Sequence, residues 1–208
     1  MILCDIGNSK VDFYSDEKIW SLSLKEFEKY SAKERVYYIN VNYLFDEKLK
    51  KDENFVDISE YFEFDTIYQG IGVDRVAACY TVKDGIVVDA GSAITVDVMN
   101  NSVHLGGYIL PGINAYEKCY SSISPILNHK INPNFLVDAL PQRTSDAVAY
   151  GAIKSILLML KDTSRDKNLY FTGGDGQFFS KFFKKSIYDR ALIFRGMKKV
   201  LYEKGIRC

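Results

Sequence analysis

The stretch Ile2–Ser9 reads ILCDIGNS: a short apolar run, an aspartate, a glycine and two small polar residues. The stretch Val87–Ala93, VVDAGSA, repeats this design. Each is followed by a segment of alternating apolar and polar residues, Lys10–Tyr14 in the first copy and Ile94–Val98 in the second. This pattern predicts a strand, a tight glycine turn and a second strand, which together form a hairpin with an acidic residue beside its turn.

A third strand-like piece follows each hairpin, Ile19–Leu22 in the first copy and Val103–Leu105 in the second. Short Asp-x-Gly strings arise by chance, but here the acid, the glycine and the flanking strand signals recur together. Two copies of one supersecondary unit favour two similar lobes that face each other. We expect the boundary between them near Asp84-Gly85, a turn dipeptide directly before the second hairpin.

Strand and helix signals alternate in the rest of the chain. Tyr37–Val41 and Leu169–Thr172 read as strands. Apolar residues at helical spacing predict a helix over residues 149–160, and Thr144 or Ser145 could cap its N-terminus. A mixture of this kind indicates an α/β chain.

The composition of the chain excludes several classes of protein. Its 208 residues are 47% hydrophobic, and 27 basic residues balance 27 acidic ones. A formal net charge of zero gives no electrostatic footprint for nucleic acid or an anionic membrane. No apolar run approaches the roughly 20 residues needed to span a bilayer. We therefore expect neither a nucleic-acid partner nor a membrane partner.

The N-terminus and the cysteines favour a cytoplasmic location. Met1–Asp5 has no basic segment before its apolar residues, which is unlike a signal peptide. The four cysteines are scattered without a C-x-x-C pair, as in reduced cytosolic proteins. His104 and His129 are the two histidines of the chain, too few for a histidine-rich metal site.

The two hairpin turns are candidate phosphate sites. The sequence has neither a Walker A motif nor a dinucleotide fingerprint. Gly7 and Gly91 lack a Cβ, so backbone N–H groups there can approach phosphate oxygens closely. Asp5 and Asp89 would repel bare phosphate and would have to act through a cation or its waters. Two ordinary hairpins with Asp turns remain the structural alternative. The short neutral donors beside the glycines are Asn8, Ser9 and Ser92.

A second candidate site is the stretch Gly70–Arg75, GIGVDR, which places an acid beside a base just after Tyr68. An Asp–Arg pair on a loop is the simple structural interpretation. In a kinase, Asp74 would receive the proton of an attacking hydroxyl, and Arg75 could bind a substrate carboxylate in a planar fork. Because phosphoryl transfer depends mainly on positioning and charge neutralisation, Asp74 could act chiefly by orienting the hydroxyl.

Two further glycine-rich stretches carry less information alone. Gly106–Gly112, GGYILPG, indicates that the backbone at the end of an apolar strand closely approaches a neighbouring group, which the sequence does not identify. Thr172–Asp175, TGGD, follows a predicted strand and could frame a nucleoside or form a simple surface turn.

Taken in order, these stretches resemble the type III pantothenate kinases of bacteria, which belong to the ATPase superfamily of acetate and sugar kinases, Hsp70 and actin. The family motifs are D-x-G-N-[ST], G-x-D-R, D-A-G-[TS]-A-x-T-x-D, G-G-x-I-x-P-G, L-P-x-x-T and T-G-G-D. They match Asp5–Ser9, Gly72–Arg75, Asp89–Asp97, Gly106–Gly112, Leu140–Thr144 and Thr172–Asp175. Ser92 stands where many members have threonine and keeps the hydroxyl.

The resemblance implies a fold of two ribonuclease H-like lobes, the actin-like ATPase fold, with mixed sheets flanked by helices and an inter-lobe cleft. The N-terminal lobe would comprise residues 1–84 and the C-terminal lobe residues 85–208, with the substrate and dimer surface in the second. It also implies a homodimer.

The activity implied is ATP-dependent phosphorylation of pantothenate to 4'-phosphopantothenate, the first step of coenzyme A biosynthesis. Asp74 would be the base, Asp89 would help to bind a monovalent cation (K⁺ or NH₄⁺), and ATP would carry a divalent cation, Mg²⁺. Asp5, Asp74 and Asp89 would then meet around metal-bound ATP and the alcohol. The ATP-binding residues would be Asp5, Ile6, Gly7, Asn8, Ser9, Lys10, Val11, Asp12 and Ser92. The pantothenate-binding residues would be Tyr68, Gly72, Val73, Asp74, Arg75 and Thr144.

Two alternatives keep the fold and change the function. One is a kinase or phosphohydrolase for another small molecule, since fold alone does not fix function. The other is a regulatory relative without catalysis, against which the presence of all three aspartates argues.

Overall fold

The computed structural model describes residues 1–132 and 139–206. The chain forms two compact units. Unit 1 consists of Met1–Lys83, Met99–Gly106 and the segment from Ala191 onward, and unit 2 consists of Asp84–Val98 and Gly107–Arg190. The predicted lobes 1–84 and 85–208 stay a prediction.

Unit 1 is built on a five-stranded sheet in the order β3-β2-β1-β4-β5. The first three strands form an antiparallel meander, whereas β4 pairs with β1, and β5 with β4, in parallel. The strands are β1 (Ile2–Ile6), β2 (Lys10–Ser15), β3 (Lys18–Ser23), β4 (Val36–Asn40) and β5 (Phe55–Asp57).

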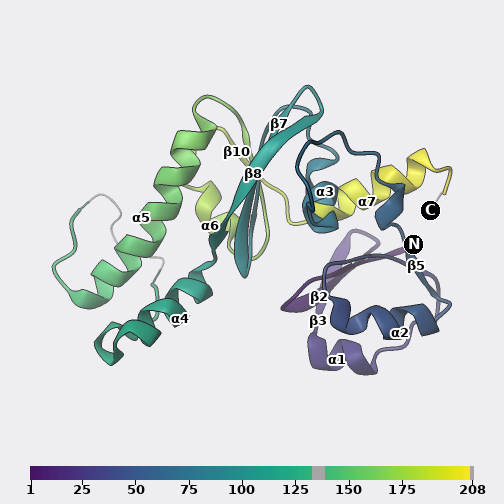
Figure 1. Ribbon diagram of the computed structural model, residues 1–208, viewed down its shortest axis with the longest axis horizontal. Coiled ribbons are helices and arrows are strands. Elements are labelled where there is room, and N and C mark those ends of the chain that lie inside the picture. Colours follow the sequence, from purple (N-terminus) through teal and green to yellow (C-terminus); the bar gives the residue numbers. More distant parts are fainter. Residues whose placement is uncertain (133–138, 207–208) are drawn as a thin grey trace. The chain divides into compact units, whose positions relative to one another are not determined.

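Both faces of this sheet are covered within unit 1. On one face, Phe27 of α1 joins a core that includes Cys4, Ile6 and Val11. On the other, α7 packs against β1 and α3, and the ring of Phe194 stacks on Tyr14 at 5.3 Å. Figure 1 shows α7 (yellow) beside α3. The helices of the described part of unit 1 are α1 (Leu24–Lys29), α2 (Asp46–Lys51), α3 (Val73–Cys79) and α7 (Leu192–Glu203), with 3₁₀ turns η1 (Tyr43–Phe45) and η2 (Ser59–Tyr61).

Unit 2 is built on a second five-stranded sheet, in the order β10-β9-β6-β7-β8. Here β9 pairs with β6, and β10 with β9, in parallel. The strands are β6 (Gly85–Ala90), β7 (Ala93–Asn100), β8 (Val103–Pro111), β9 (Leu169–Thr172) and β10 (Ser186–Tyr188). Two of these strands are shared between the units: β7 passes from unit 2 to unit 1 after Val98, and β8 passes back to unit 2 after Gly106.

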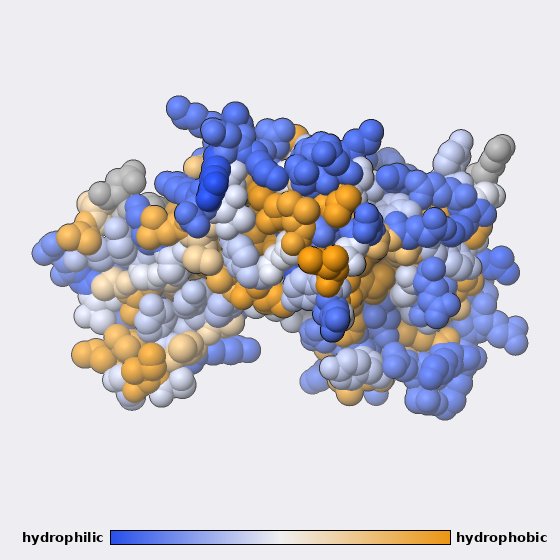
Figure 2. All heavy atoms as spheres, turned by 45° about the horizontal axis from the view of Figure 1, so that its top comes forward, coloured by the Kyte–Doolittle hydropathy of each residue, from blue (hydrophilic) through white to orange (hydrophobic). Residues whose placement is uncertain are grey.

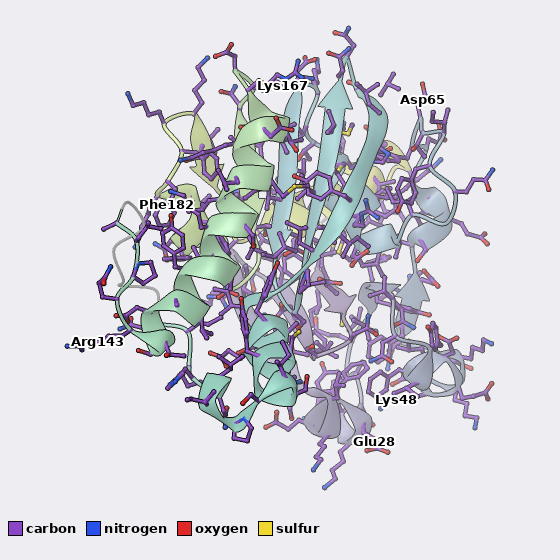
Figure 3. All side chains as sticks on the ribbon, turned by 60° about the vertical axis from the view of Figure 1, so that its left-hand side comes forward. Glu28, Lys48, Asp65, Arg143, Lys167 and Phe182 are labelled. Carbon is purple, nitrogen blue, oxygen red and sulfur yellow. The ribbon has the colours of Figure 1, made fainter. Side chains whose placement is uncertain are left out.

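One helix supplies much of the core of unit 2. The apolar stripe of α5, which includes Ala152, Ile153 and Ile156, is buried in one cluster with Val88 and Phe171 of the sheet. Figure 3 shows α5 (green) lying across the strands. The helices of the described part of unit 2 are α4 (Ile113–Ile123), α5 (Thr144–Ser164) and α6 (Gly176–Ser180), with a 3₁₀ turn η3 (Pro125–Leu127).

The structure confirms the internal repeat. Starting from the edge strand that follows the hairpin, the order is β3-β2-β1-β4-β5 in unit 1 and β8-β7-β6-β9-β10 in unit 2. Strands in the same place in the two sheets thus come in the same order along the chain. The loops from β6 to β7 and from β7 to β8 have two residues each, a length that only antiparallel neighbours permit. The β2–β3 turn at Asp16-Glu17 and the β7–β8 turn at Asn101-Ser102 both have positive φ angles of 50–65°, which suits type I′ hairpin turns.

One local expectation was wrong: neither Thr144 nor Ser145 caps α5. Its N-cap is Arg143, in extended conformation, no side chain caps the helix, and Thr144 is its first residue. The simple interpretation of the Gly70–Arg75 stretch as a loop holds only in part, because α3 begins at Val73 with Gly72 as its N-cap.

Within residues 1–132 and 139–206, no helix is long and apolar enough to cross a membrane. Figure 2 shows hydrophilic and hydrophobic residues interspersed over the surface that faces the viewer.

Candidate active site

The first predicted phosphate turn is a tight hairpin between β1 and β2. Its loop is Gly7–Ser9, and the N–H of Gly7 donates to the carbonyl of Lys10 at 3.1 Å. A Cβ on Gly7 would lie 3.2 Å from that carbonyl oxygen, so glycine is the residue that fits here without crowding. Asn8 and Ser9 are exposed to solvent.

Acidic side chains gather on one face of this hairpin. Asp5 and Asp12 are register partners, and side chains directly opposite one another lie on the same face. Two like charges at such positions repel, and the structure offsets them: Lys10 forms an ion pair with Asp12 at 2.7 Å, and the Ser21 hydroxyl donates to the same carboxylate. The hairpin therefore presents two carboxylates and one ammonium group, a set suited to metal-bound phosphates.

The opposite face of the hairpin is apolar. Ile6 and Val11 are fully buried in the core of unit 1, so a contribution of either residue to ATP binding would come from its backbone. Cys4 lies on the same face, and burial, with the charges of Asp5 and Asp12 adding to it, raises the pKa of its thiol well above the ordinary value. Cys4 is therefore a neutral core residue.

Asn42, which directly follows β4 and Val41, braces the phosphate turn. It is 4% exposed, and its amide donates to the carbonyl of Gly7 at 3.2 Å, while its side-chain oxygen accepts the N–H of Leu44 at 3.2 Å. The N–H of Val41 donates to the carbonyl of Ile6. The carboxyl ends of the parallel strands β1 and β4 are thus tied together where the turn begins. The sequence analysis did not single out Asn42, since an asparagine after a strand is also a common turn residue.

The G-x-D-R motif lies beside this same sheet edge in unit 1. A Cβ on Gly72 would lie 3.8 Å from Cγ1 of Val41, the residue bonded to the end of β1. Asp74 is in the first turn of α3, and its carboxylate accepts the N–H of Arg75 at 2.8 Å. The end of β1 at Ile6 and the G-x-D-R motif at Gly72, 66 residues apart in the sequence, therefore both adjoin Val41, the residue that follows β4.

Arg75 is held by aromatic packing. The residue is 6% exposed, and its guanidinium carbon lies 4.8 Å from the centroid of the Tyr68 ring. A cation over the face of a tyrosine ring is attracted by the ring quadrupole. The structure thus brings the predicted pair Tyr68 and Arg75 together.

In unit 2, the GGYILPG stretch packs against the second phosphate turn, Gly91-Ser92. The N–H of Gly91 donates to the carbonyl of Ala93 at 2.9 Å, and the N–H of Gly112 donates to that of Ser92 at 3.2 Å. A methyl group on Gly112 would overlap the carbonyl oxygens of Gly91 and Ser92. The GGYILPG stretch therefore ends in a glycine because the backbone of the Gly91-Ser92 turn lies directly against it, and the Ser92 side chain is exposed.

The TGGD stretch, Thr172–Asp175, packs against Asp89 and Ala90. Asp89 is aligned with Thr172 across the parallel β6–β9 pair. Gly173, with φ of 80°, lies so close that a Cβ there would overlap the Asp89 carboxylate and the Ala90 carbonyl. The N–H of Asp175 donates to that carbonyl at 2.9 Å, and burial raises the pKa of the Asp175 carboxyl. Two motifs distant in sequence, GGYILPG and TGGD, thus pack against the segment Asp89–Ser92.

The donor set at Asp89 fits a loosely held hard cation. In the described part of the chain, no group of three or more His, Cys, Asp or Glu side chains is arranged to hold a metal ion. A cation beside Asp89 would take one carboxylate, with backbone carbonyls such as that of Ala90 and water completing the shell. Oxygen ligands with little total charge suit an alkali cation better than a transition metal.

Thr144, the remaining predicted substrate residue, is exposed at the start of α5 in unit 2. The L-P-x-x-T motif before it includes Leu140, whose side chain is 77% exposed. An exposed leucine and threonine in a motif are available to a ligand or a partner.

The comparisons with known proteins identify the family. The family model for type III pantothenate kinases matches residues 61–166. The type III pantothenate kinase of Campylobacter jejuni is 54% identical over 98% of this chain and 97% of its own length, and that of Helicobacter hepaticus is 50% identical over 97% and 98%.

Solved structures agree in fold. A Campylobacter jejuni protein described as a Baf family transcriptional activator is 53% identical, with a TM-score of 0.92 over 99% of both chains. The ethanolamine utilization protein EutJ of Carboxydothermus hydrogenoformans, at 14% identity and a TM-score of 0.53 over 94% of this chain and 87% of its own, shares the actin-like ATPase fold. Because the family model covers half of the chain and the curated type III pantothenate kinases match it over nearly its whole length, the chain belongs to the type III pantothenate kinase family.

Proposed function

We propose that this pantothenate kinase, which phosphorylates pantothenate with ATP in coenzyme A biosynthesis, uses Asp74 as the base that faces the primary hydroxyl of pantothenate. One observation carries the proposal: within unit 1, Gly72 and the turn after Ile6 both adjoin Val41. A carboxylate at the start of α3 therefore lies near the turn suited to phosphates.

The role of Asp74 is mainly orientation. Phosphoryl transfer has a loose transition state, so the acceptor oxygen needs correct placement more than complete proton removal. The N–H of Arg75 donates to one oxygen of the Asp74 carboxylate, which limits the directions in which the carboxylate can turn, and we assign this carboxylate to accept the substrate hydroxyl. A carboxylate held in this way can receive the proton as the bond to phosphorus forms.

Pantothenate also has a carboxylate, and we assign its recognition to Arg75. The planar guanidinium can bind a carboxylate through two parallel N–H bonds. The Tyr68 ring under it limits the directions in which the guanidinium can turn. Gly72 and Val73 would contribute backbone contacts, and Thr144 a hydroxyl.

ATP binding is assigned to the β1–β2 turn and to Ser92. Exposed N–H and hydroxyl groups of Asn8 and Ser9 would bind phosphate oxygens, and Lys10 would offset their charge. Asp5 and Asp12 would hold the waters of the Mg²⁺ that accompanies ATP. Asp89 would hold the monovalent cation, K⁺ or NH₄⁺, whose charge lowers the cost of bringing phosphates near carboxylates.

We further propose a cytoplasmic homodimer without nucleic-acid or membrane partners. Its support is compositional and local: the net charge is zero, and unit 2 exposes several large apolar side chains, among them Ile109, Ile123, Ile126 and Leu158. Such side chains on one unit suit an interface between copies of the chain. Sedimentation or light scattering measures the oligomeric state directly.

The test of the site is the pair Asp74→Asn and Asp16→Asn, assayed by ADP release with pantothenate, with and without K⁺. Asp74→Asn should lower kcat about 100-fold or more and leave the melting temperature unchanged. Asp16→Asn is the matched control, since Asp16 lies at a positive φ of 50° in the β2–β3 turn, where asparagine fits well. Near-full activity of Asp74→Asn would remove Asp74 from the mechanism.

A regulatory role is the second candidate function, favoured by the description of the Campylobacter jejuni relative as a transcriptional activator. It predicts ATP binding without turnover by purified protein. If the purified protein phosphorylates pantothenate but none of a panel of other alcohols, the regulatory role is not needed to explain its ATP binding.

A further inference from the structure

A buried histidine anchors the loop that carries Tyr68. His104, in β8, is 1% exposed and lies in the part of β8 that belongs to unit 1. The backbone N–H of His104 donates to the backbone carbonyl of Asp65 at 3.0 Å, and the backbones of His104 and Thr66 form an isolated parallel β-bridge. Figure 3 labels Asp65 on the loop beside the strands. The backbone of the loop is therefore fixed to β8 where His104 lies.

The side chains extend this connection toward Tyr68. The Thr66 hydroxyl and Nδ1 of His104 are 2.7 Å apart, and the N–H of Tyr68 donates to the same hydroxyl oxygen at 3.0 Å. A hydroxyl that accepts the Tyr68 N–H still has its own hydrogen to donate. The arrangement in which Thr66 donates to Nδ1 therefore satisfies all three groups.

Ring contacts complete the chain of residues. The His104 ring lies 5.5 Å from that of Phe64 and 6.0 Å from that of Tyr68, and the Tyr68 ring in turn lies under the Arg75 guanidinium. One buried imidazole thus fixes the backbone and contacts the ring of the residue on which Arg75 stacks.

We propose that His104 and Thr66 are positioning residues for pantothenate: they hold the Tyr68 ring so that Arg75 presents its guanidinium to the pantothenate carboxylate. This inference rests on the assignment of Tyr68 and Arg75 to pantothenate above. Neither His104 nor Thr66 touches the substrate in this scheme.

The polar nature of the contact supports positioning over simple packing. Apolar side chains could fill the same space, but they would not fix the direction of the Tyr68 N–H. A hydrogen-bonded pair fixes one arrangement and costs free energy if either partner is lost, because the other stays buried without its bond. Specific orientation of a loop is what such a pair provides.

The test is Thr66→Val against Thr66→Ser. Valine keeps the shape and removes the hydroxyl, and serine keeps the hydroxyl and removes the methyl group. We expect Thr66→Val to raise KM for pantothenate about 10-fold, with kcat and KM for ATP changed less than about twofold, whereas Thr66→Ser should stay near the parent values. Thr163→Val is the matched control, because it removes a threonine hydroxyl that bonds the Tyr108 hydroxyl at 2.8 Å in unit 2.

Several results would overturn the inference. A folded Thr66→Val enzyme with unchanged KM for pantothenate would do so, as would equal losses in kcat and in both KM values. If Thr66→Val does not fold, His104→Asn and His104→Gln replace it, since an asparagine oxygen can stand near Nδ1 and a glutamine oxygen cannot. We expect a lower KM for pantothenate in the Asn variant than in the Gln variant, and equal values would refute the role.

Arg75→Gln separates this inference from the assignment beneath it. If Arg75→Gln raises KM for pantothenate and Thr66→Val does not, positioning by Thr66 fails while Arg75 keeps its role. If neither variant affects KM, both the assignment and the inference are wrong.

Discussion

Replacing Gly196 by alanine tests the close packing of α3 and α7. Gly196 lies in the middle of α7, and a Cβ there would lie 2.8 Å from the carbonyl carbon and 3.2 Å from the Cα of Ala77, and it would overlap the Ala77 oxygen. These atoms belong to the backbone of α3, so no side-chain rotation relieves the overlap. The two helices would have to separate.

The expected magnitude follows from two opposing effects. Overpacking against fixed backbone costs about 3 kcal/mol, the upper end of its usual range. Alanine in a helix interior gains about 1 kcal/mol over glycine. The net loss of about 2 kcal/mol should lower the melting temperature by about 4–8 °C for a chain of this size.

Gly151→Ala is the matched control, because the same substitution should have the opposite sign there. Gly151 is exposed in α5, and its added methyl would meet the Tyr120 hydroxyl oxygen at 2.9 Å, the tip of a side chain that can move. Only the helix gain of about 1 kcal/mol should remain. Differential scanning calorimetry of both variants checks the signs. A Gly196→Ala protein as stable as the parent would show that the α3–α7 approach is not as close as described.

Three further substitutions have defined outcomes. Ser23→Ala removes the capping box that Ser23 shares with Glu26 at the start of α1. It should lower the free energy of unfolding, measured in urea, by about 1 kcal/mol. The hydrogen bonds from Ser23 lower the pKa of Glu26, so NMR titration of the variant should show this pKa rising toward its ordinary value. Burial raises the pKa of Tyr38 to about 12, above the value of about 10 in an unfolded chain. Its contribution to stability is therefore complete below pH 10 and is lost as the pH rises toward 12, and Tyr38→Phe should flatten the melting-temperature profile across that range. Gly112→Ala should displace the carbonyl of Ser92, which would lie 2.6 Å from the new methyl group, and raise KM for ATP about 10-fold or more with little change in KM for pantothenate; equal effects on both substrates would argue against a role of this turn in ATP binding.

The duplicated hairpins were predictable because their signals are local. An apolar run, an aspartate, a glycine and an alternating segment lie within about a dozen residues in each copy, and strand period and turn chemistry act over that range. The strand β9 was predicted at its observed bounds, Leu169–Thr172, for the same reason. The resemblance added the family and the order of the motifs.

Features decided by distant contacts were missed. The pair of Thr66 and His104 joins residues 38 positions apart, and no periodicity marks either residue. The beginning of α3 was not predicted, because Gly-x-Gly is typical of a turn. The expected N-cap of α5, Thr144 or Ser145, lies one or two residues too late in the chain: Arg143 is the extended N-cap residue, and its backbone carbonyl accepts the N–H of Ala147.

The membership of α7 in unit 1 has a consequence for how the protein is made. The sheet face that carries Leu3 and Tyr14 is covered by a helix that begins at Leu192. During translation this face emerges first and its cover emerges almost 190 residues later. The core of unit 1 therefore cannot be completed until α7 has been made, and the contact between β1 and α7, which joins residues far apart in the sequence, is of the kind that slows folding.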